Sequence, residues 1–270
     1  MKECIEMKTM KKLLPLGLAL ALALTATACG KKEEAEKTHI DEEVLKAGVL
    51  TVGISTDYPP FESLDTQGNI VGYDVDMAKY LADQIKTKEG ASYTLEFVQM
   101  EFSNIISALQ TGQVDVGIAA FSYDPERDCL FTDPYYLSAQ VVVVRKDSGI
   151  ESLDDLKGKS IAAGTGTTGY DEAEKIEDAT VSSPGNYLQQ FELLRVNQID
   201  AVVCDKTVGE GYVNSGDDLM ILDTLVEEDL CITVKKGNTN ILNALNNAIG
   251  EFISSGTSDE YKGNWGLLEE

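Results

Sequence analysis

Apolar positions along this chain repeat with two periods, and the two periods alternate. Leu50–Ile54 and Thr94–Gln99 are short runs typical of strands, whereas residues 74–86 place apolar side chains at helical spacing. Ser103 is expected to cap the next helix, and Val114–Ala120 is the strand that follows it. This order predicts an α/β fold with largely parallel sheets and a ligand site beyond the carboxyl ends of the strands.

One helix–strand unit occurs twice. The segment ALQTGQVD (108–115) is matched in the second half of the chain by LLRVNQID (193–200). Each copy has Gly or Asn at the same place, and these residues tolerate the left-handed backbone at a helix end. The repetition predicts two similar lobes, each containing one such unit.

The strands of the two units are followed by polar residues of complementary charge. Ser122 and Arg127 come after the first strand, and Asp205 ends the second. If the units lie in facing lobes, a cation and an anion stand about one small molecule apart. A free amino acid carries that pair of charges inverted. Taken alone, Arg127 is typical of a surface residue, and Asp205 is equally compatible with a helix cap.

The chain is expected to cross between the lobes twice. The apolar run Ala139–Val144 enters the second lobe, which continues with a strand at Ser160–Ala163, a glycine-rich turn at Gly164–Gly169 and a helix at Tyr170–Ile176. Leu230–Lys236 returns the chain to the first lobe. Two crossings predict a two-strand hinge with a cleft between the lobes. The predicted first lobe comprises residues 41–140 and 235–270, and the second comprises residues 141–234.

The charge of the chain excludes one class of function. Its 270 residues are 43% hydrophobic and 25% charged, which is ordinary for a globular protein, but the formal net charge is −24. Residues 1–28 contribute four Lys and two Glu, a net +2, so the remainder carries −26. Such a surface repels phosphate backbones and offers no basic stripe, so we expect no nucleic-acid partner.

The first thirty residues predict an export signal. Basic residues precede the apolar run Leu13–Leu24, and small residues then lead to Cys29. Cys29 stands where bacterial lipoprotein signals place the lipidated residue, although Ala26 occupies a position that is usually Leu. We therefore expect a signal peptide over 1–28, with an ordinary cleaved signal as the alternative. A lipid on Cys29 and a flexible tether over 29–40 would hold the protein at the outer face of the cell membrane, as in Gram-positive lipoproteins.

The other cysteines are expected to be structural. Cys129, Cys204 and Cys231 have neither metal-ligand spacing nor the pattern of a disulfide framework. We interpret them as small buried thiols, with a role for Cys129 or Cys204 near a ligand as the alternative. No metal and no cofactor is expected.

Several motifs in one order resemble a known family. They are TDYPPFE (56–62), VGYDVDMA (71–78), EFSNIISAL (101–109), PER (125–127), FTDPYY (131–136) and GTTG (166–169). Together they resemble the bacterial extracellular solute-binding proteins of family 3, the amino-acid receptors of ABC importers, from about Val49 to Trp265. The resemblance implies a type II periplasmic-binding-protein-like fold whose two α/β lobes close on a ligand.

The resemblance also implies roles for individual residues. Arg127 would bind the ligand α-carboxylate through a bidentate contact, together with Thr167 and Thr168 at a helix start. Asp205 would pair with the α-ammonium. The remaining expected contacts are Ser122 and the carbonyl of Ala120 around the ammonium, and the aromatic rings of Tyr58 and Phe102 against the ligand side chain.

The ligand side chain and the partners are less closely specified. Ser55 stands where relatives that bind cationic or amide ligands carry Asp, so a polar or uncharged amino acid such as glutamine or cystine is favoured. The expected partners are this ligand, an ABC permease with its ATPase subunits, and the membrane through the lipid, with the protein itself a monomer. The alternatives are a ligand-sensing receptor subunit and a small-carboxylate dehydratase. Catalysis is not expected, because the only His lies in the tether.

Overall fold

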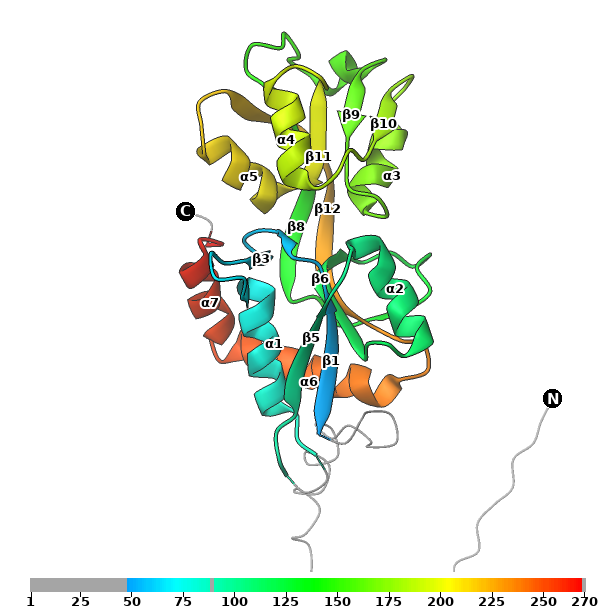
Figure 1. Cartoon of the computed structure of the whole chain (residues 1–270), viewed down its shortest axis with the longest axis vertical. Coiled ribbons are helices and arrows are strands. Elements are labelled where there is room, and N and C mark those ends of the chain that lie inside the picture. The colour runs from blue at the N-terminus through cyan, green and yellow to red at the C-terminus, as the bar shows by residue number, and fades with distance from the viewer. Residues whose placement is uncertain (1–47, 88–89, 269–270) are drawn as a thin grey trace, which may run out of the picture.

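The computed structural model describes residues 48–87 and 90–268, which form two lobes joined by two long strands (Figure 1). This mixed α/β architecture confirms the predicted fold class. The expected signal peptide, Cys29 and the tether lie outside the described residues. Within the described segments, no helix combines the length and apolar character needed to span a bilayer.

The first lobe is built on three parallel strands. β1 (Val49–Ile54) pairs with β5 (Thr94–Gln99) on one side and with β6 (Val116–Ser122) on the other. Helices α1 (Tyr73–Gln84) and α2 (Phe102–Thr111) flank this sheet on opposite sides, so β6 is buried along its whole length (Figure 1). A small antiparallel sheet contains β2 (Asp57–Tyr58), β3 (Glu62–Leu64) and β4 (Ile70–Val71).

The second lobe repeats this plan. β9 (Ser160–Ala162) runs parallel to both β10 (Thr180–Ser182) and β11 (Ala201–Asp205). The helices of this lobe are η1 (Leu153–Leu156), α3 (Thr168–Glu174), α4 (Tyr187–Arg195) and α5 (Lys206–Asn214). The sequence repeat thus corresponds to α2–β6 in one lobe and α4–β11 in the other.

Each copy of the repeat contains an aspartate that ties its unit to a neighbouring strand. Asp115 accepts the backbone N–H of Thr51 at 2.8 Å, near the start of β1. Asp200 accepts the backbone N–H of Ser160 at 2.8 Å and its hydroxyl at 2.7 Å, at the start of β9. The matching residues therefore make matching contacts in the two lobes.

Two long antiparallel strands connect the lobes. β8 (Tyr136–Arg145) pairs with β12 (Leu219–Val234) from Tyr136 to Arg145, and β8 also pairs with β11 in the second lobe. From Leu230 onward, β12 pairs with β6 and with β7 (Leu130–Phe131) of the first lobe. This pairing favours a return to the first lobe near Leu230. The lobe limits expected from the sequence stay a prediction.

Two helix starts differ from expectation. Ser103 does not cap α2, because the helix begins at Phe102 and Glu101 occupies the cap position without a side-chain hydrogen bond. The helix expected from Tyr170 begins at Thr168, because the Thr167 hydroxyl accepts the N–H of Tyr170 and caps it. The expected left-handed helix ends are confirmed at Gly112 (φ 72°) and Asn197 (φ 59°).

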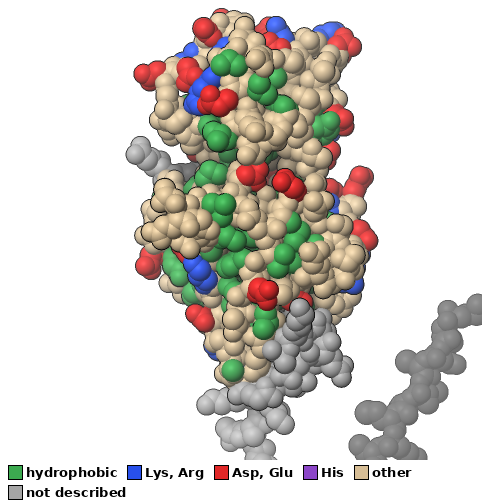
Figure 2. Space-filling view, in the orientation of Figure 1, with side chains coloured by type: hydrophobic (Ala, Val, Ile, Leu, Met, Phe, Trp, Pro, Cys, Tyr) green, Lys and Arg blue, Asp and Glu red, His purple; other side chains and the backbone are tan. Residues whose placement is uncertain are grey.

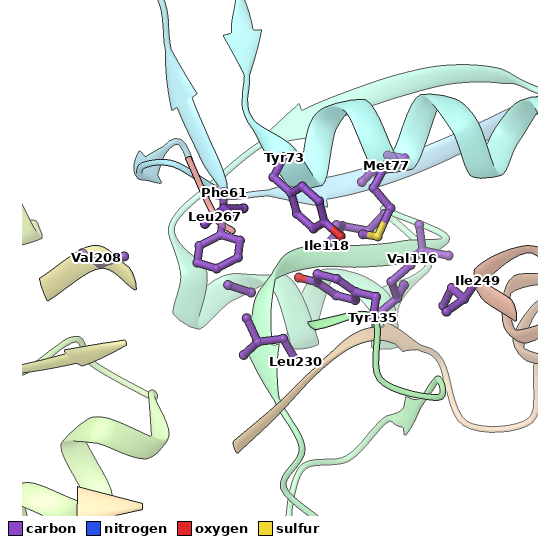
Figure 3. Packing of buried hydrophobic residues seen from close by; sticks show 14 of the residues in the cluster. Phe61, Tyr73, Met77, Val116, Ile118, Tyr135, Val208, Leu230, Ile249 and Leu267 are labelled. Carbon is purple, nitrogen blue, oxygen red and sulfur yellow. The ribbon is translucent and has the colours of Figure 1, made fainter. Parts of the chain in front are cut away.

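The chain after β12 completes the first lobe. α6 (Thr239–Ser254) and α7 (Thr257–Trp265) pack with α1. Beneath α1 lies a large buried cluster that includes Phe61, Tyr73 and Tyr135, as Figure 3 shows. Phe61 is fully buried in this core. On the outside, Asp and Glu side chains are spread over both lobes, in keeping with the net charge (Figure 2).

The three cysteines of the described residues are buried, as predicted, and they are free. Burial raises the pKa of the Cys129 thiol to about 11 and that of Cys231 to about 12. Burial also raises the pKa of Cys204 well above its usual value. All three are therefore protonated at neutral pH and pack as small apolar side chains.

Candidate ligand cleft

A cavity of about 1070 Å³ lies between the lobes, at the carboxyl ends of β6 and β11. Its lining comes from both lobes. It contains all eight residues that the sequence proposed for ligand contact: Tyr58, Phe102, Ala120, Ser122, Arg127, Thr167, Thr168 and Asp205. The topology therefore brings together side chains that are as many as 147 residues apart, although this proximity does not by itself test their roles.

Arg127 supplies the positive charge of the cleft. Its side chain is only 11% exposed, and its guanidinium carbon lies 5.5 Å from the ring centre of Phe102 and 5.3 Å from that of Phe121. Nη2 donates to the carbonyl of Gly166 at 3.0 Å, across the cleft, and Nε lies 3.4 Å from Asp124. Nη1 is buried and has no partner among the described residues. The guanidinium is thus fixed in orientation while one donor is left for an anion.

The two threonines at the start of α3 differ in what they can offer. The Thr167 hydroxyl donates to the Gly164 carbonyl at 2.8 Å and accepts the N–H of Tyr170, so its hydrogen is already used in capping. The Thr168 hydroxyl is buried without a partner in the described structure. Of the two hydroxyls, that of Thr168 is therefore the one available to an anion beside Arg127.

Asp205 supplies a buried negative charge on the opposite lobe. Although it precedes α5, its side chain makes no helix-cap hydrogen bond, so the alternative of a cap is wrong. Its carboxylate instead accepts the Ser138 hydroxyl at 2.8 Å and the hydroxyl of Tyr58. Burial, and secondly the negative charge of Glu228, raise the pKa of Asp205 to about 7. A cation placed beside it would favour the ionised form.

Ser122 and Ala120 end β6 close to two residues that the sequence did not single out. The Ser122 hydroxyl donates to Glu228 at 2.6 Å, and the Gln140 side-chain amide donates to the same oxygen at 2.9 Å. Because the Ser122 hydrogen is used, its oxygen is left as an acceptor. Gln140 lines the cavity from the hinge strand β8, and the only sequence signal for it was a polar residue within an apolar run.

The two aromatic residues have different surroundings. Tyr58 belongs to the first lobe, yet its hydroxyl contacts Asp205 and its ring lies 5.0 Å from that of Tyr187 in the second. Phe102 stacks on Phe121 with ring centres 4.5 Å apart. Tyr58 is therefore tied into a contact between the lobes, whereas Phe102 forms an apolar wall beside Arg127.

The cavity is more acidic than the sequence suggested. Four of its lining residues, Asp57, Glu62, Glu101 and Asp205, carry carboxyl groups, whereas Arg127 is its one cationic residue among those described. The Ser55 hydroxyl donates to Asp57 at 2.6 Å. Although Ser55 stands where relatives that bind cationic or amide ligands carry Asp, β2 places the carboxylate of Asp57 beside it.

Comparison with known proteins relates this arrangement to one family. The family described as bacterial extracellular solute-binding proteins, family 3, matches residues 50–268. The arginine-binding extracellular protein ArtP of Bacillus subtilis (strain 168) is 31% identical over 264 residues, which cover 95% of this chain and 98% of that protein.

Solved structures show the same likeness. A mutant of ArgBP from T. maritima is 36% identical, with a TM-score of 0.76, and the match covers 84% of this chain and 99% of that one. The ancestral amino acid-binding protein AncCDT-1, described as a precursor of cyclohexadienyl dehydratase, is 32% identical, with a TM-score of 0.76 over 83% of this chain and 98% of that one.

Proposed function

The chain belongs to the bacterial extracellular solute-binding proteins, family 3, and on that premise we propose that it binds a free L-amino acid for an ABC importer. Arg127 and the Thr168 hydroxyl bind the α-carboxylate. Asp205, the Ser122 oxygen and the Ala120 carbonyl bind the α-ammonium. The observation that carries this proposal is the pair of opposite charges at the ends of β6 and β11, one from each lobe, lining a single cavity.

Ligand binding is proposed to be coupled to closure of the lobes. Each charged end of the ligand contacts residues of both lobes, so the ligand has its full set of contacts only when the lobes are together. β8 and β12 are the hinge strands, and the permease recognises the closed form. We propose that the protein acts as a monomer and is held outside the membrane by a lipid on Cys29.

The side chain of the ligand is proposed to be polar or cationic. The sequence favours a polar, uncharged amino acid on the basis of Ser55. Once Arg127 and Asp205 serve the α-groups, Asp57, Glu62 and Glu101 remain as acidic residues of the cavity. Glu62 is only 1% exposed, so Asp57 and Glu101 are the two that a ligand side chain would meet. Their charge favours a ligand with a cationic side chain and disfavours glutamate or aspartate. The name of the arginine-binding relative from Bacillus subtilis supports this extension.

We do not favour a catalytic function. AncCDT-1 is described as an amino acid-binding protein that is a precursor of a dehydratase. Similarity to it is therefore no argument for catalysis over binding. The receptor-subunit alternative uses the same cleft and the same ligand contacts. The test below therefore addresses ligand binding itself.

A thermal-unfolding screen tests the proposal. The purified protein is heated with each of the twenty amino acids, ornithine and cystine, at equal concentration. We expect arginine, lysine, ornithine or glutamine to raise the midpoint, because a ligand at 100 times its dissociation constant adds about 2.7 kcal/mol of stability. Glutamate and aspartate are the matched controls and should give no shift. A flat screen across all these ligands would contradict amino-acid binding.

Affinity for the ligand found in the screen should depend on pH. The ammonium pairs with ionised Asp205, whose pKa is raised to about 7 by burial in the ligand-free protein. Protons therefore compete with the ligand below pH 7, and affinity should fall by up to ten-fold per pH unit there while levelling off above pH 8. Isothermal titration calorimetry between pH 6 and 8 measures this dependence. Affinity that is constant over that range would speak against Asp205 as the ammonium partner.

A further inference from the structure

Two acidic side chains lie together behind the ammonium side of the cleft. Glu62 on β3 is 1% exposed and Asp74 on α1 is 0% exposed. Their segments are held in register, because the N–H of Asp74 donates to the Phe61 carbonyl at 3.0 Å. A Cβ atom at Gly72 would lie 1.9 Å from that same carbonyl oxygen, so the approach of the two segments requires glycine. This close approach of the two backbone segments places the carboxyl groups of Glu62 and Asp74 side by side.

The hydrogen bonds of the pair imply one shared proton. Asp74 Oδ2 accepts the backbone N–H of Ala120 at 3.0 Å and the hydroxyl of Tyr135 at 2.9 Å. Each carboxyl group also has a buried oxygen, Asp74 Oδ1 and Glu62 Oε2, with no hydrogen-bond partner among the described residues. Two carboxyl groups that hydrogen-bond to each other away from water cannot both stay ionised, so the pair holds one proton between its two members.

The proton belongs on Glu62. Burial, and secondly the charge of Asp74, raise the pKa of Glu62 well above its usual value. Burial also raises the pKa of Asp74, but hydrogen bonds from Ala120, Tyr135 and Glu62 limit the rise to about 6. The other titratable groups that face the pair are Asp57, Asp205, Tyr73 and Tyr135. At neutral pH, Asp74 is thus the ionised member and Glu62 is its hydrogen-bond donor.

Ala120 is the link from this pair to the cleft. Its φ of +45° lies in the left-handed region, which is uncommon for a residue with a side chain. It lines the cavity at the end of β6, and its N–H is held by Asp74. A strained backbone of this kind persists only where its surroundings hold it in place. Figure 3 shows Tyr135, the second donor to Asp74, packed in the core beside Tyr73.

We propose that Glu62 and Asp74 are positioning residues for the ammonium site, acting as a proton-sharing pair that fixes the backbone of Ala120. Protonated Glu62 holds Asp74, and ionised Asp74 holds the Ala120 N–H, so the Ala120 carbonyl keeps the orientation needed to accept from the ligand. This inference rests on the proposed function only for the identity of the ligand group. The link from Glu62 to Ala120 is a property of the ligand-free protein.

The test separates the link from ligand binding by using two measurements on the full chain. Amide hydrogen exchange at Ala120, followed by NMR without ligand, reports the Asp74 contact. Calorimetry with L-arginine and L-glutamine as probes reports affinity. We expect Asp74→Asn to speed exchange at Ala120 at least ten-fold while the amides of β1 stay protected, and to weaken binding roughly ten-fold. Glu62→Gln retains a donor to Asp74, so it should keep affinity within about three-fold.

Asp83→Asn is the matched control, since it removes the same charge from an exposed position of the same helix. It should change neither measurement. If Asp74→Asn lowers the unfolding midpoint but leaves both Ala120 exchange and affinity unchanged, the pair is only structural and the inference is wrong. If exchange responds as expected but neither probe binds the unaltered protein, the link stands and the proposed ligand class fails.

Discussion

Replacing Arg127 by methionine should weaken binding of the amino acid by roughly thirty-fold to several thousand-fold, equivalent to about 2 to 5 kcal/mol. The guanidinium is buried and lies against Phe102 and Phe121, and its Nη1 has no partner among the residues that the structure describes. Methionine preserves an apolar contact with both rings but leaves the ligand carboxylate buried without its counter-charge. Calorimetry with the ligand identified by thermal unfolding measures the loss.

Two further variants sharpen this result. Arg127→Lys keeps the positive charge but loses the planar fork, so its affinity should lie between those of the methionine variant and the unaltered protein. Lys146→Met removes one positive charge from an exposed position outside the cavity and should leave affinity unchanged. Affinity that survives in Arg127→Met would rule out this residue as the carboxylate partner.

Replacing Asp205 by asparagine should also weaken binding by at least thirty-fold. Asparagine keeps the size of the side chain, and its one oxygen can still accept from Ser138 or from Tyr58, but it offers the ligand ammonium no charge. The pH dependence of affinity near neutrality should disappear with it. Both effects are measured by calorimetry across the pH range used for the unaltered protein.

Although Asp205→Asn should bind the ligand more weakly, the stability of this variant without ligand should not fall. The folded-state pKa of Asp205 is raised by burial to about 7, so ionisation of this group lowers the stability of the folded state as pH rises from about 4 to about 7, and the full cost is present above pH 7. Asp205→Asn removes that cost, and its unfolding midpoint at pH 8 should be no lower than that of the unaltered protein. A residue that weakens stability but serves binding is expected at a functional site.

Asp200→Asn is the matched control, because Asp200 immediately precedes the strand that Asp205 ends. Asp200 accepts two hydrogen bonds from Ser160 and its pKa is lowered by them, against the opposing effect of burial. Its neutral variant should therefore lose stability above pH 4 and keep its affinity, which is the reverse of the Asp205 result. If both variants bind normally, the two-charge model of the cleft is wrong.

Much of the fold followed from local pattern. The order of strands and helices depends on apolar periodicity, and the repeated unit appears in the structure as α2–β6 and α4–β11 with matching roles for Asp115 and Asp200. Helix starts were less well predicted, because a cap requires that a particular side-chain oxygen lie within hydrogen-bond distance of a backbone N–H in the first turn. Ser103 has the right chemistry for a cap but lies inside α2, whereas Thr167 caps α3.

By itself, the sequence determined the α/β architecture, the two-strand hinge and the gathering of eight candidate residues in one cleft, because strand ends in this topology meet at the cleft. Only the tertiary structure decided how their hydrogen bonds are distributed. Tyr58 joins Asp205 across 147 positions, Gln140 and Glu228 surround Ser122, Asp57 lies beside Ser55, and Glu62 meets Asp74. Such contacts depend on burial and side-chain direction between distant segments, which the local pattern of residues does not specify.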